Sequence, residues 1–363
     1  MRRNLKINLI AKKMKLLDYI NGIELAKMIC EGYIKVVSHP IFPLKMYSYT
    51  QLCHYERVWN DTTMKCRGLI VDNEDNIISK PMKKFFNYEE YEDKNEIPSY
   101  SNVEIFEKLD GTLGILYWYM DIPYIATKGS FDSEQAKHAT NILHTKYRNI
   151  WNELKRDCTY LFEIIYREDK HIISYNNIDD IFLIAILDNN NDYEYDISWY
   201  TIFNKPKKYL NIKDWKNIRN EVDGTNKEGF VIKFPNDFRL KMKYDEYLEL
   251  HMTKYSFSKN KIIQLMVDNN VDEINNIMSM FEDEERVYIQ SLIDEYSNEF
   301  NRIYTICKTE FRNDFETKKE AADYIKTCTY PSILFIMLTR NDKCVNDVIW
   351  KYVKRNLKRK NEE

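Results

Sequence analysis

The segment Lys108-Leu109-Asp110-Gly111 holds the residues of this chain whose chemistry is most specific. A lysine amine attacks a nucleotide α-phosphate only when it is neutral and held in line with the departing pyrophosphate. Because an ordinary lysine is protonated at pH 7, nearby cations, a metal ion or desolvation must favour its neutral form. Asp110 can orient what the lysine receives, and Gly111 allows close backbone approach. The alternative is a surface hairpin turn, since so short a pattern is common.

Residues that such a lysine needs follow in order along the chain: Glu163 in Phe162-Glu163, Glu228 in Glu228-Gly229-Phe230-Val231, and the pair Lys241 and Lys243. Residues two apart on a strand face the same side, so the two lysines can grip an α-phosphate and lower the proton affinity of Lys108. The alternatives are a buried, paired acid for Glu163, an edge-strand acid for Glu228 and solvated charge for the lysines.

Four further blocks accompany this series: Tyr47-Ser48-Tyr49, Cys66-Arg67-Gly68, Pro81-Met82-Lys83-Lys84-Phe85-Phe86-Asn87, and Thr127-Lys128-Gly129-Ser130 followed by Ser133-Glu134-Gln135-Ala136. The ordered set resembles the covalent nucleotidyltransferase superfamily of ATP-dependent DNA ligases, RNA ligases and mRNA capping enzymes. The Pro81–Asn87 block narrows the resemblance to the phage-type RNA ligase 1 family, the tRNA-repair RNA ligases. Similarity is dense from about Tyr47 to Thr253.

The resemblance implies a role for each matched residue. Lys108 would be the catalytic nucleophile, Glu163 would bind the ribose, and Glu228 would lie near the phosphates and a metal ion. The implied nucleotide-binding residues are Tyr49, Arg67, Lys84, Lys108, Asp110, Gly111, Lys128, Glu163, Glu228, Lys241 and Lys243. The implied metal ligands are Glu228 and Asp272. For Arg67, Lys84 and Lys128 the alternative is a surface cation, and for Asp272 it is a helix N-terminal acid.

The resemblance also implies an activity. An ATP-dependent RNA ligase would transfer AMP from ATP to Lys108 with Mg²⁺ or Mn²⁺, pass it to an RNA 5′-phosphate, and seal the strand with a 3′-hydroxyl. The RNA partner would be a single-stranded end, such as a tRNA cleaved in its anticodon loop. Two alternatives stay open: a non-catalytic RNA-binding scaffold with this fold, and a DNA ligase or a GTP-using capping enzyme.

The pattern of apolar and polar residues changes near residue 255. Before it, short apolar runs separated by polar turns predict strands at Gly68–Asp72, Asn76–Ser79, Ile115–Tyr119, Tyr124–Thr127, Tyr160–Tyr166, Ile181–Leu187, Gly229–Phe234 and Phe238–Lys243. One helix interrupts them, with Asp132 as the expected N-cap. After residue 255 the periodicity is helical. We therefore expect an α+β adenylyltransferase domain of antiparallel sheets with flanking helices at 1–255 and an all-helical domain, with a role in RNA or tRNA specificity, at 256–363.

Composition limits the remaining classes of function. The 363 residues are 44% hydrophobic and 31% charged, and no apolar stretch approaches the length of a membrane span. The N-terminus lacks the apolar core of a secretory signal, and the seven cysteines form no C-x-x-C pair, so we expect a cytoplasmic protein, in the host cytoplasm if viral. We also expect a monomer. With a net charge of −3, RNA contact requires a local basic surface. The basic stretch Lys351–Lys360 is either such a surface or a solvated tail.

Overall fold

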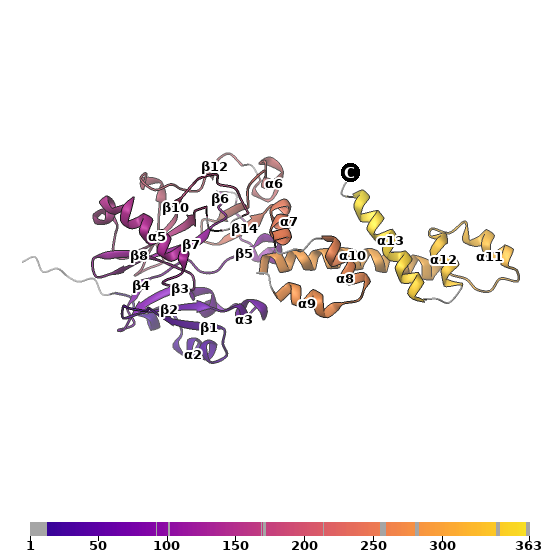
Figure 1. Cartoon of the computed structure of the whole chain (residues 1–363), viewed down its shortest axis with the longest axis horizontal. Helices are drawn as coiled ribbons and strands as arrows, with labels where there is room; N and C mark the ends of the chain where they lie inside the picture. Colours follow the sequence, from indigo (N-terminus) through magenta and orange to yellow (C-terminus); the bar gives the residue numbers. More distant parts are fainter. Residues whose placement is uncertain are drawn as a thin grey trace, which may run out of the picture. The chain divides into compact units, whose positions relative to one another are not determined.

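The computed structural model describes residues 13–91, 93–100, 102–167, 169, 172–212, 214–254, 259–279, 283–338 and 342–360. The chain divides into two compact units, Met1–Leu250 and His251–Glu363, whereas the sequence placed the boundary at residue 255. The first unit contains mainly antiparallel sheets with flanking helices, and the second contains helices (Figure 1). The α+β fold class expected from the sequence is therefore confirmed.

The first sheet lies near the start of the described chain. Its antiparallel strands are, in order, β1 (Ile34–Ser38), β2 (Leu44–Tyr49), β3 (Arg67–Asp72) and β4 (Ile77–Ser79). The short helices around it are α1 (Leu16–Tyr19), α2 (Gly22–Cys30), α3 (Gln51–Tyr55) and α4 (Asp61–Lys65). Leu25 and Met28 of α2 pack with Leu69 and Val71 of β3, so the amphipathic helix covers one face of the sheet.

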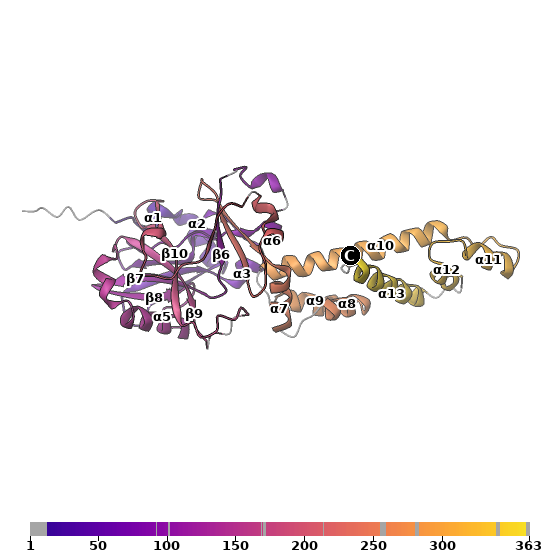
Figure 2. The same cartoon turned by 90° about the horizontal axis from the view of Figure 1, so that it is seen from above.

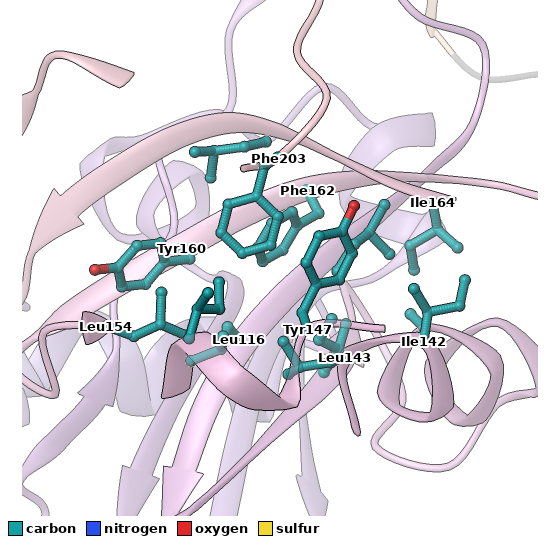
Figure 3. Packing of buried hydrophobic residues seen from close by; sticks show 14 of the residues in the cluster. Leu116, Ile142, Leu143, Tyr147, Leu154, Tyr160, Phe162, Ile164 and Phe203 are labelled. Atoms are coloured by element: carbon teal, nitrogen blue, oxygen red, sulfur yellow. The ribbon is translucent and has the colours of Figure 1, made fainter. Parts of the chain in front are cut away.

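The second sheet has the strand order β11-β10-β9-β7-β8. These strands are β7 (Thr112–Tyr119), β8 (Ile122–Thr127), β9 (Cys158–Ile165), β10 (Asp180–Asp188) and β11 (Glu194–Tyr195). On one face, α5 (Glu134–Thr145) packs its apolar side, including Leu143, against Phe162 and Ile164 of β9 (Figure 3). On the other face, side chains of β7 such as Ile115 pack against Met46 and Ile70 of the first sheet.

The third sheet brings the distant motifs into one register. Its order is β12-β6-β13-β14-β5, with β5 (Phe86–Asn87), β6 (Glu104–Lys108), β12 (Lys208–Tyr209), β13 (Gly229–Lys233) and β14 (Arg239–Lys243). Gly229 pairs with Lys108 on one side and with Lys243 on the other. Because β6 and β7 belong to different sheets, the segment after Lys108 connects two sheets and is not a hairpin turn.

The eight expected strands are all present, with ends that shift by a few residues, but the predicted helix start is wrong. The N-cap of α5 is Ser133, whose hydroxyl accepts a hydrogen bond from the Ala136 amide at 3.2 Å. Asp132 is instead an acceptor for the hydroxyl of Ser130 at 3.1 Å. A serine next to an aspartate gives two adjacent capping residues, and local periodicity does not choose between them.

Short helical turns complete the first unit: η1 (Tyr88–Glu90), η2 (Lys94–Glu96), η3 (Arg148–Glu153), η4 (Ile197–Trp199), η5 (Trp215–Asn217) and α6 (Ile218–Glu221). Helix α7 (Asp245–Lys254) runs across the division between the units. Within the described residues, no helix has the length and apolar character that a membrane crossing requires.

The second unit consists of α8 (Lys259–Val267), α9 (Val271–Ser279), α10 (Asp283–Glu310), α11 (Lys318–Ile325), α12 (Pro331–Met337) and α13 (Asp342–Lys360). Figure 2 shows α8 and α9 beside α10, with which they are in contact. Leu292 and Cys307 of α10 are buried in one core with Val345 and Val353 of α13, which confirms the helical periodicity expected after residue 255.

A buried carboxylate ties α5 to the second sheet. Asp180, at the start of β10, is 2% exposed and accepts hydrogen bonds from Lys146 Nζ at 2.6 Å, Tyr147 Oη at 2.8 Å and Asn204 Nδ2 at 2.7 Å. A buried charge is tolerated only with such partners. The network therefore fixes the C-terminal end of α5 against the sheet that carries Glu163.

We predict that Asp180→Ala lowers the free energy of unfolding by about 3 kcal/mol, because it strands buried donors. The neighbouring Asp179 is exposed and pairs with His138 at 2.6 Å, so Asp179→Ala should change stability by less than about 1 kcal/mol. Urea unfolding followed by circular dichroism measures both. Equal effects of the two substitutions would contradict a structural role for the Asp180 network.

Candidate active site

One buried carboxylate joins two of the predicted lysines. Glu228 is 2% exposed, and its two oxygens lie 2.8 Å from Lys108 Nζ and 3.0 Å from Lys243 Nζ. The register of the third sheet explains this geometry, since Gly229 sits between Lys108 and Lys243 across adjacent strands. Three motifs that are far apart in the sequence thus meet at one end of β6, β13 and β14.

The pairing of β13 with β14 leaves no room for a side chain at Gly229. Its φ is +156°, and a Cβ added there would lie 2.0 Å from the carbonyl oxygen of Met242. Any other residue would force β13 and β14 apart. The glycine after Glu228 therefore allows the close approach that places Glu228 between the two lysines.

The protonation state of Lys108 differs from the sequence-based expectation. Burial by itself would lower the pKa of Lys108, but the charges of Glu228 and Glu163 and the hydrogen bond to Glu228 outweigh it. The pKa of Lys108 therefore lies above its ordinary value in this structure. The expected lowering of the pKa of Lys108 is wrong for this structure, because the carboxylates outweigh the effect of burial.

The lysine whose pKa falls is Lys241. Burial, followed by the charges of Lys84, Lys108 and Lys243, holds the pKa of Lys241 well below its ordinary value. Lys84 itself is 8% exposed and sits in the Pro81–Asn87 block. The site thus brings four lysines close together, and two of them, Lys108 and Lys243, pair with Glu228. Such a concentration of positive charge favours an anionic ligand with several charges.

Glu163 lies on β9, opposite Leu113 of β7, and is half-buried. Burial raises the pKa of its carboxyl to about 7, against the opposing charge of Lys108. Within the described part of the chain, the Glu163 carboxylate has no hydrogen-bond or ion-pair partner. The buried, paired acid considered as an alternative is therefore not what the structure has, and the group can accept a hydrogen bond from a ligand.

Both carboxylate oxygens of Asp110 accept hydrogen bonds from other parts of the protein. Its Oδ2 accepts hydrogen bonds from the amides of Ile172 at 2.7 Å and Ile173 at 3.0 Å, and its Oδ1 accepts one from Tyr247 Oη at 3.0 Å. The amide of Asp110 donates to Tyr175 Oη at 2.6 Å. These bonds hold the pKa of Asp110 below its ordinary value despite burial. Asp110 therefore fixes the connection that follows Lys108.

Tyr49, the last residue of β2, meets Lys128, which directly follows β8. The Lys128 ammonium lies 4.5 Å from the centre of the Tyr49 ring and 3.4 Å from its hydroxyl. The hydroxyl of Ser48 donates to the carbonyl of Lys128, which fixes the turn before α5. Such a cation over an aromatic face keeps its charge while its N–H groups can still reach a ligand.

Arg67 is joined to the lysine cluster through one aromatic ring. The guanidinium of Arg67 lies 5.9 Å from the centre of the Phe85 ring, and Lys241 Nζ lies 5.6 Å from it. Phe85 therefore links a cation of the first sheet to one of the third. From the sequence, Phe85 was only one residue of the Pro81–Asn87 block, and no role was predicted for it.

The remaining predicted residues lie elsewhere. Asp272 is exposed in the first turn of α9, in the second unit, so its pairing with Glu228 as a metal ligand stays a prediction. Lys351, Lys354 and Arg355 are exposed on α13, whereas the side chains of residues 358–360, like the N-terminal residues 1–12, lie outside the described ones. Tyr175 and Tyr247 were missed because, among 28 tyrosines, their type gives no signal.

Comparison with known proteins places this arrangement in context. A profile of the family described as RNA ligase matches residues 65–247. An RNA ligase of Rhodothermus phage RM378 is 21% identical over 391 residues, covering 86% of this chain and 87% of the relative. A protein named as a bifunctional polynucleotide kinase/RNA ligase, from Autographa californica nuclear polyhedrosis virus, is 25% identical over 289 residues, 69% of this chain but only 41% of the relative.

Solved structures show a weaker likeness. The structure of Naegleria gruberi RNA ligase with pyrophosphate has 19% identity and a TM-score of 0.34, and the match covers 41% of this chain and 51% of that one. This chain therefore spans about half or less of the length of two of these relatives.

We predict that Gly111→Ala destabilises the protein by about 1–3 kcal/mol, because the added Cβ would lie 2.7 Å from both Glu163 Cγ and the Ile164 carbonyl oxygen. The matched control is Gly129→Ala, whose Cβ would meet only the flexible end of Lys35, at 3.2 Å. Its effect should stay within about 0.5 kcal/mol. Thermal unfolding of the two variants distinguishes them, and equal stability would refute the close packing of Gly111 on Glu163.

A second prediction concerns the pH dependence of stability. The pKa of Glu163 rises from 4.5 to about 7 on folding, so its contribution is present below pH 4.5 and is lost as pH rises through about 7. Glu163→Gln removes this loss. The unfolding temperature of the variant minus that of the wild type should therefore increase between pH 4.5 and 7 and level off above. A difference that does not change with pH would contradict the raised pKa.

Proposed function

The chain belongs to the RNA ligase family, and from this membership and the geometry of its site we propose that it is an ATP-dependent RNA ligase that joins RNA 5′-phosphate and 3′-hydroxyl ends. The observation that carries the proposal is the buried cluster in which Glu228 binds Lys108 and Lys243 beside Lys241. A nucleophilic amine, a carboxylate and an excess of cations are what transfer of a nucleotidyl group requires.

In the first step, Lys108 Nζ attacks the α-phosphorus of ATP. A phosphorus–nitrogen bond forms, the bond from the α-phosphorus to the bridging oxygen breaks, and pyrophosphate leaves with that oxygen. The attacking nitrogen gives up its extra proton to water. Lys241 and Lys243 hold the α-phosphate, whose developing charge they stabilise. Because Lys108 is paired with Glu228 in the free protein, ligand binding has to loosen this pair before the amine can react.

Binding of the rest of the nucleotide follows from the other cations and from Glu163. Arg67, Lys84 and Lys128 bind the leaving pyrophosphate, Arg67 with a planar fork and the lysines as point charges. Tyr49 holds Lys128 in place through its ring. The Glu163 carboxylate accepts hydrogen bonds from the ribose hydroxyls, for which its lack of a partner among the described residues leaves it available.

A divalent cation, Mg²⁺ or Mn²⁺, fits this site only in part. The described residues contain no group of three or more acidic, histidine or cysteine side chains that could hold a metal alone. In this proposal Glu228 would hold the ion, because Mg²⁺ prefers carboxylate, phosphate and water oxygens. Bound there, the metal would neutralise phosphate charge and compete with Lys108 for Glu228. Asp272 remains a proposed further ligand.

In the later steps AMP passes from Lys108 to the RNA 5′-phosphate, and a 3′-hydroxyl then displaces AMP to form the phosphodiester bond. We propose single-stranded RNA ends as substrates, including a tRNA cleaved in its anticodon loop, with the helical unit from about residue 251 onward helping to select the RNA. The exposed cations of α13 suit contact with phosphates.

The test is covalent labelling. Purified protein incubated with Mg²⁺ and α-labelled ATP should retain label after denaturation, and Lys108→Ala should lose it by at least roughly 1,000-fold, because no other group replaces the nucleophile. Lys45 is exposed on β2, so Lys45→Ala should label like the wild type.

The other outcomes decide between the alternatives. Release of the label on addition of RNA with a 5′-phosphate and a 3′-hydroxyl, with appearance of joined RNA, would support ligation. Label from GTP in place of ATP would point to a capping enzyme. No label from either nucleotide, with the protein folded, would refute the proposal in favour of a non-catalytic RNA-binding scaffold.

A further inference from the structure

A polar pocket with a volume of about 720 Å³ lies in the first unit, since all of its lining residues belong to Met1–Leu250. Volumes of roughly 300–1,000 Å³ are typical of small-molecule sites. Met242 lines this pocket, and its side chain points to the opposite side of β14 from those of Lys241 and Lys243, because neighbouring residues of a strand alternate. The pocket therefore lies across the third sheet from the lysines proposed to bind the α-phosphate.

The pocket shares its wall with the network around Asp110. Ile172 and Ile173 line the pocket, and their amides donate to Asp110 at 2.7 and 3.0 Å. Tyr247 also lines it, and its hydroxyl donates to the same carboxylate at 3.0 Å. The pocket thus borders the segment that follows the proposed nucleophile, Lys108.

Three polar side chains at the pocket are available to a ligand. Lys216, Asn220 and Glu246 line it and are exposed. Among the residues that the structure describes, none of the three has a hydrogen-bond or ion-pair partner. Lys216 Nζ lies 5.7 Å from the centre of the Trp215 ring, which leaves its charge uncompensated. The pocket therefore offers a cation, an amide and a carboxylate that are not already paired.

Asp223 adds a second carboxylate. It lines the pocket, and its Oδ1 accepts hydrogen bonds from the amide of Thr225 at 3.0 Å and from the hydroxyl of Thr225 at 2.8 Å. These bonds hold the pKa of Asp223 below its ordinary value, so the carboxyl group is ionised at neutral pH. Its Oδ2 has no hydrogen-bond or ion-pair partner within the described part of the chain and can accept a hydrogen bond from a ligand.

These groups match the parts of a ribonucleotide. Carboxylates accept hydrogen bonds from ribose hydroxyls, a lysine attracts a phosphate, and an asparagine amide can pair with the edge of a base. Tyr88, half-buried and edge-to-face with Trp215 at 5.7 Å, adds an aromatic surface for a base. Four acidic and three basic side chains line the pocket, so it has no excess of positive charge for a triphosphate.

We propose that this pocket binds a ribonucleotide of the RNA strand that ends in the 3′-hydroxyl, with Asp223 and Glu246 accepting hydrogen bonds from ribose hydroxyls and Lys216 contacting a phosphate. The inference deepens the proposed function and rests on it. The strand with the 5′-phosphate meets the lysine cluster on the other side of the sheet, and the acidic groups of the pocket would repel that doubly charged end. The other strand brings only hydroxyls and singly charged phosphodiesters.

The test measures discrimination between ribose and deoxyribose. A short single-stranded RNA with a fluorescent label at its 5′ end and a free 3′-hydroxyl is bound to the full chain without ATP and followed by fluorescence anisotropy. Deoxyribose in the 3′-terminal nucleotides should weaken binding to the wild type about 10-fold, because it removes hydrogen bonds to carboxylates. The same change in the 5′-terminal nucleotides should weaken it less than about 2-fold.

The carboxylates are tested by the double variant Asp223→Asn, Glu246→Gln. Both side chains are exposed and keep their shape, so the fold should be retained. The preference for ribose at the 3′ end should fall from about 10-fold to about 2-fold or less, because the strong acceptors are lost. Glu153→Gln, at an exposed residue that does not line the pocket, should keep the wild-type preference.

The cation gives an independent readout. Lys216→Ala should weaken binding of the ribose and deoxyribose strands equally, by about 3-fold at low salt, and should reduce the salt dependence of binding, because a phosphate contact does not report the sugar. Lys45→Ala, at an exposed residue outside the pocket, should change neither affinity.

Three results would overturn the proposal: no RNA binding by the wild type, equal binding of the ribose and deoxyribose strands, or an unchanged preference in the double variant. Equal losses from deoxyribose at the two ends would contradict the assignment to the 3′ end. Because binding is measured without ATP, absence of ATP labelling refutes the proposed function alone, while the preference for ribose still decides what the pocket binds.

Discussion

The arrangement of the site depends on one ion-pair network, in which the buried Glu228 carboxylate binds the ammonium groups of both Lys108 and Lys243. A carboxylate that is 2% exposed is tolerated only with such partners. Two features of the third sheet make the network geometrically feasible: the register that aligns three strands, and Gly229, whose missing side chain lets β14 approach. One carboxylate cannot neutralise two lysines, so a positive charge remains beside Lys241.

The opposite shifts of two neighbouring lysines describe a site at rest. The carboxylates keep the proton on Lys108, whereas burial and three cations weaken the hold of Lys241 on its own. A bound polyphosphate would change both lysines. Its negative charge would favour the protonated form of Lys241, and its binding would draw Lys108 and Lys243 away from Glu228. The free protein thus holds Lys108, the proposed nucleophile, in its protonated, unreactive form. Reactivity would arise only with the ligand in place.

The sequence predicted local features well and spatial relations poorly. Short apolar runs between polar turns located eight strands, and the ordered motifs singled out Lys108, Glu228 and Lys243, but the pairing of Glu228 with the two lysines was not predicted. Periodicity does not report which strands are neighbours, so the sheet change after Lys108 and the role of β6 were missed. Periodicity also does not reveal partners such as Tyr247, because this tyrosine is 137 positions from Asp110 in the sequence and contacts it only in the folded protein. The direction of the Lys108 pKa shift depends on the distances from Lys108 to Glu228 and Glu163, which periodicity does not report.

Cations from different sheets converge here although they repel each other. Two unit charges 5 Å apart at an effective dielectric constant of 20 repel by about 3 kcal/mol, a substantial part of the stability of a domain. Carboxylates alone could cancel this repulsion, but they would also cancel the attraction for phosphates. Aromatic faces lie against several of these cations in addition to the carboxylates at Lys108, with Phe85 between Arg67 and Lys241, and Tyr49 under Lys128. Neutral rings attract cations without cancelling their charge, and the Lys83–Asn87 segment places two phenylalanines directly after two lysines.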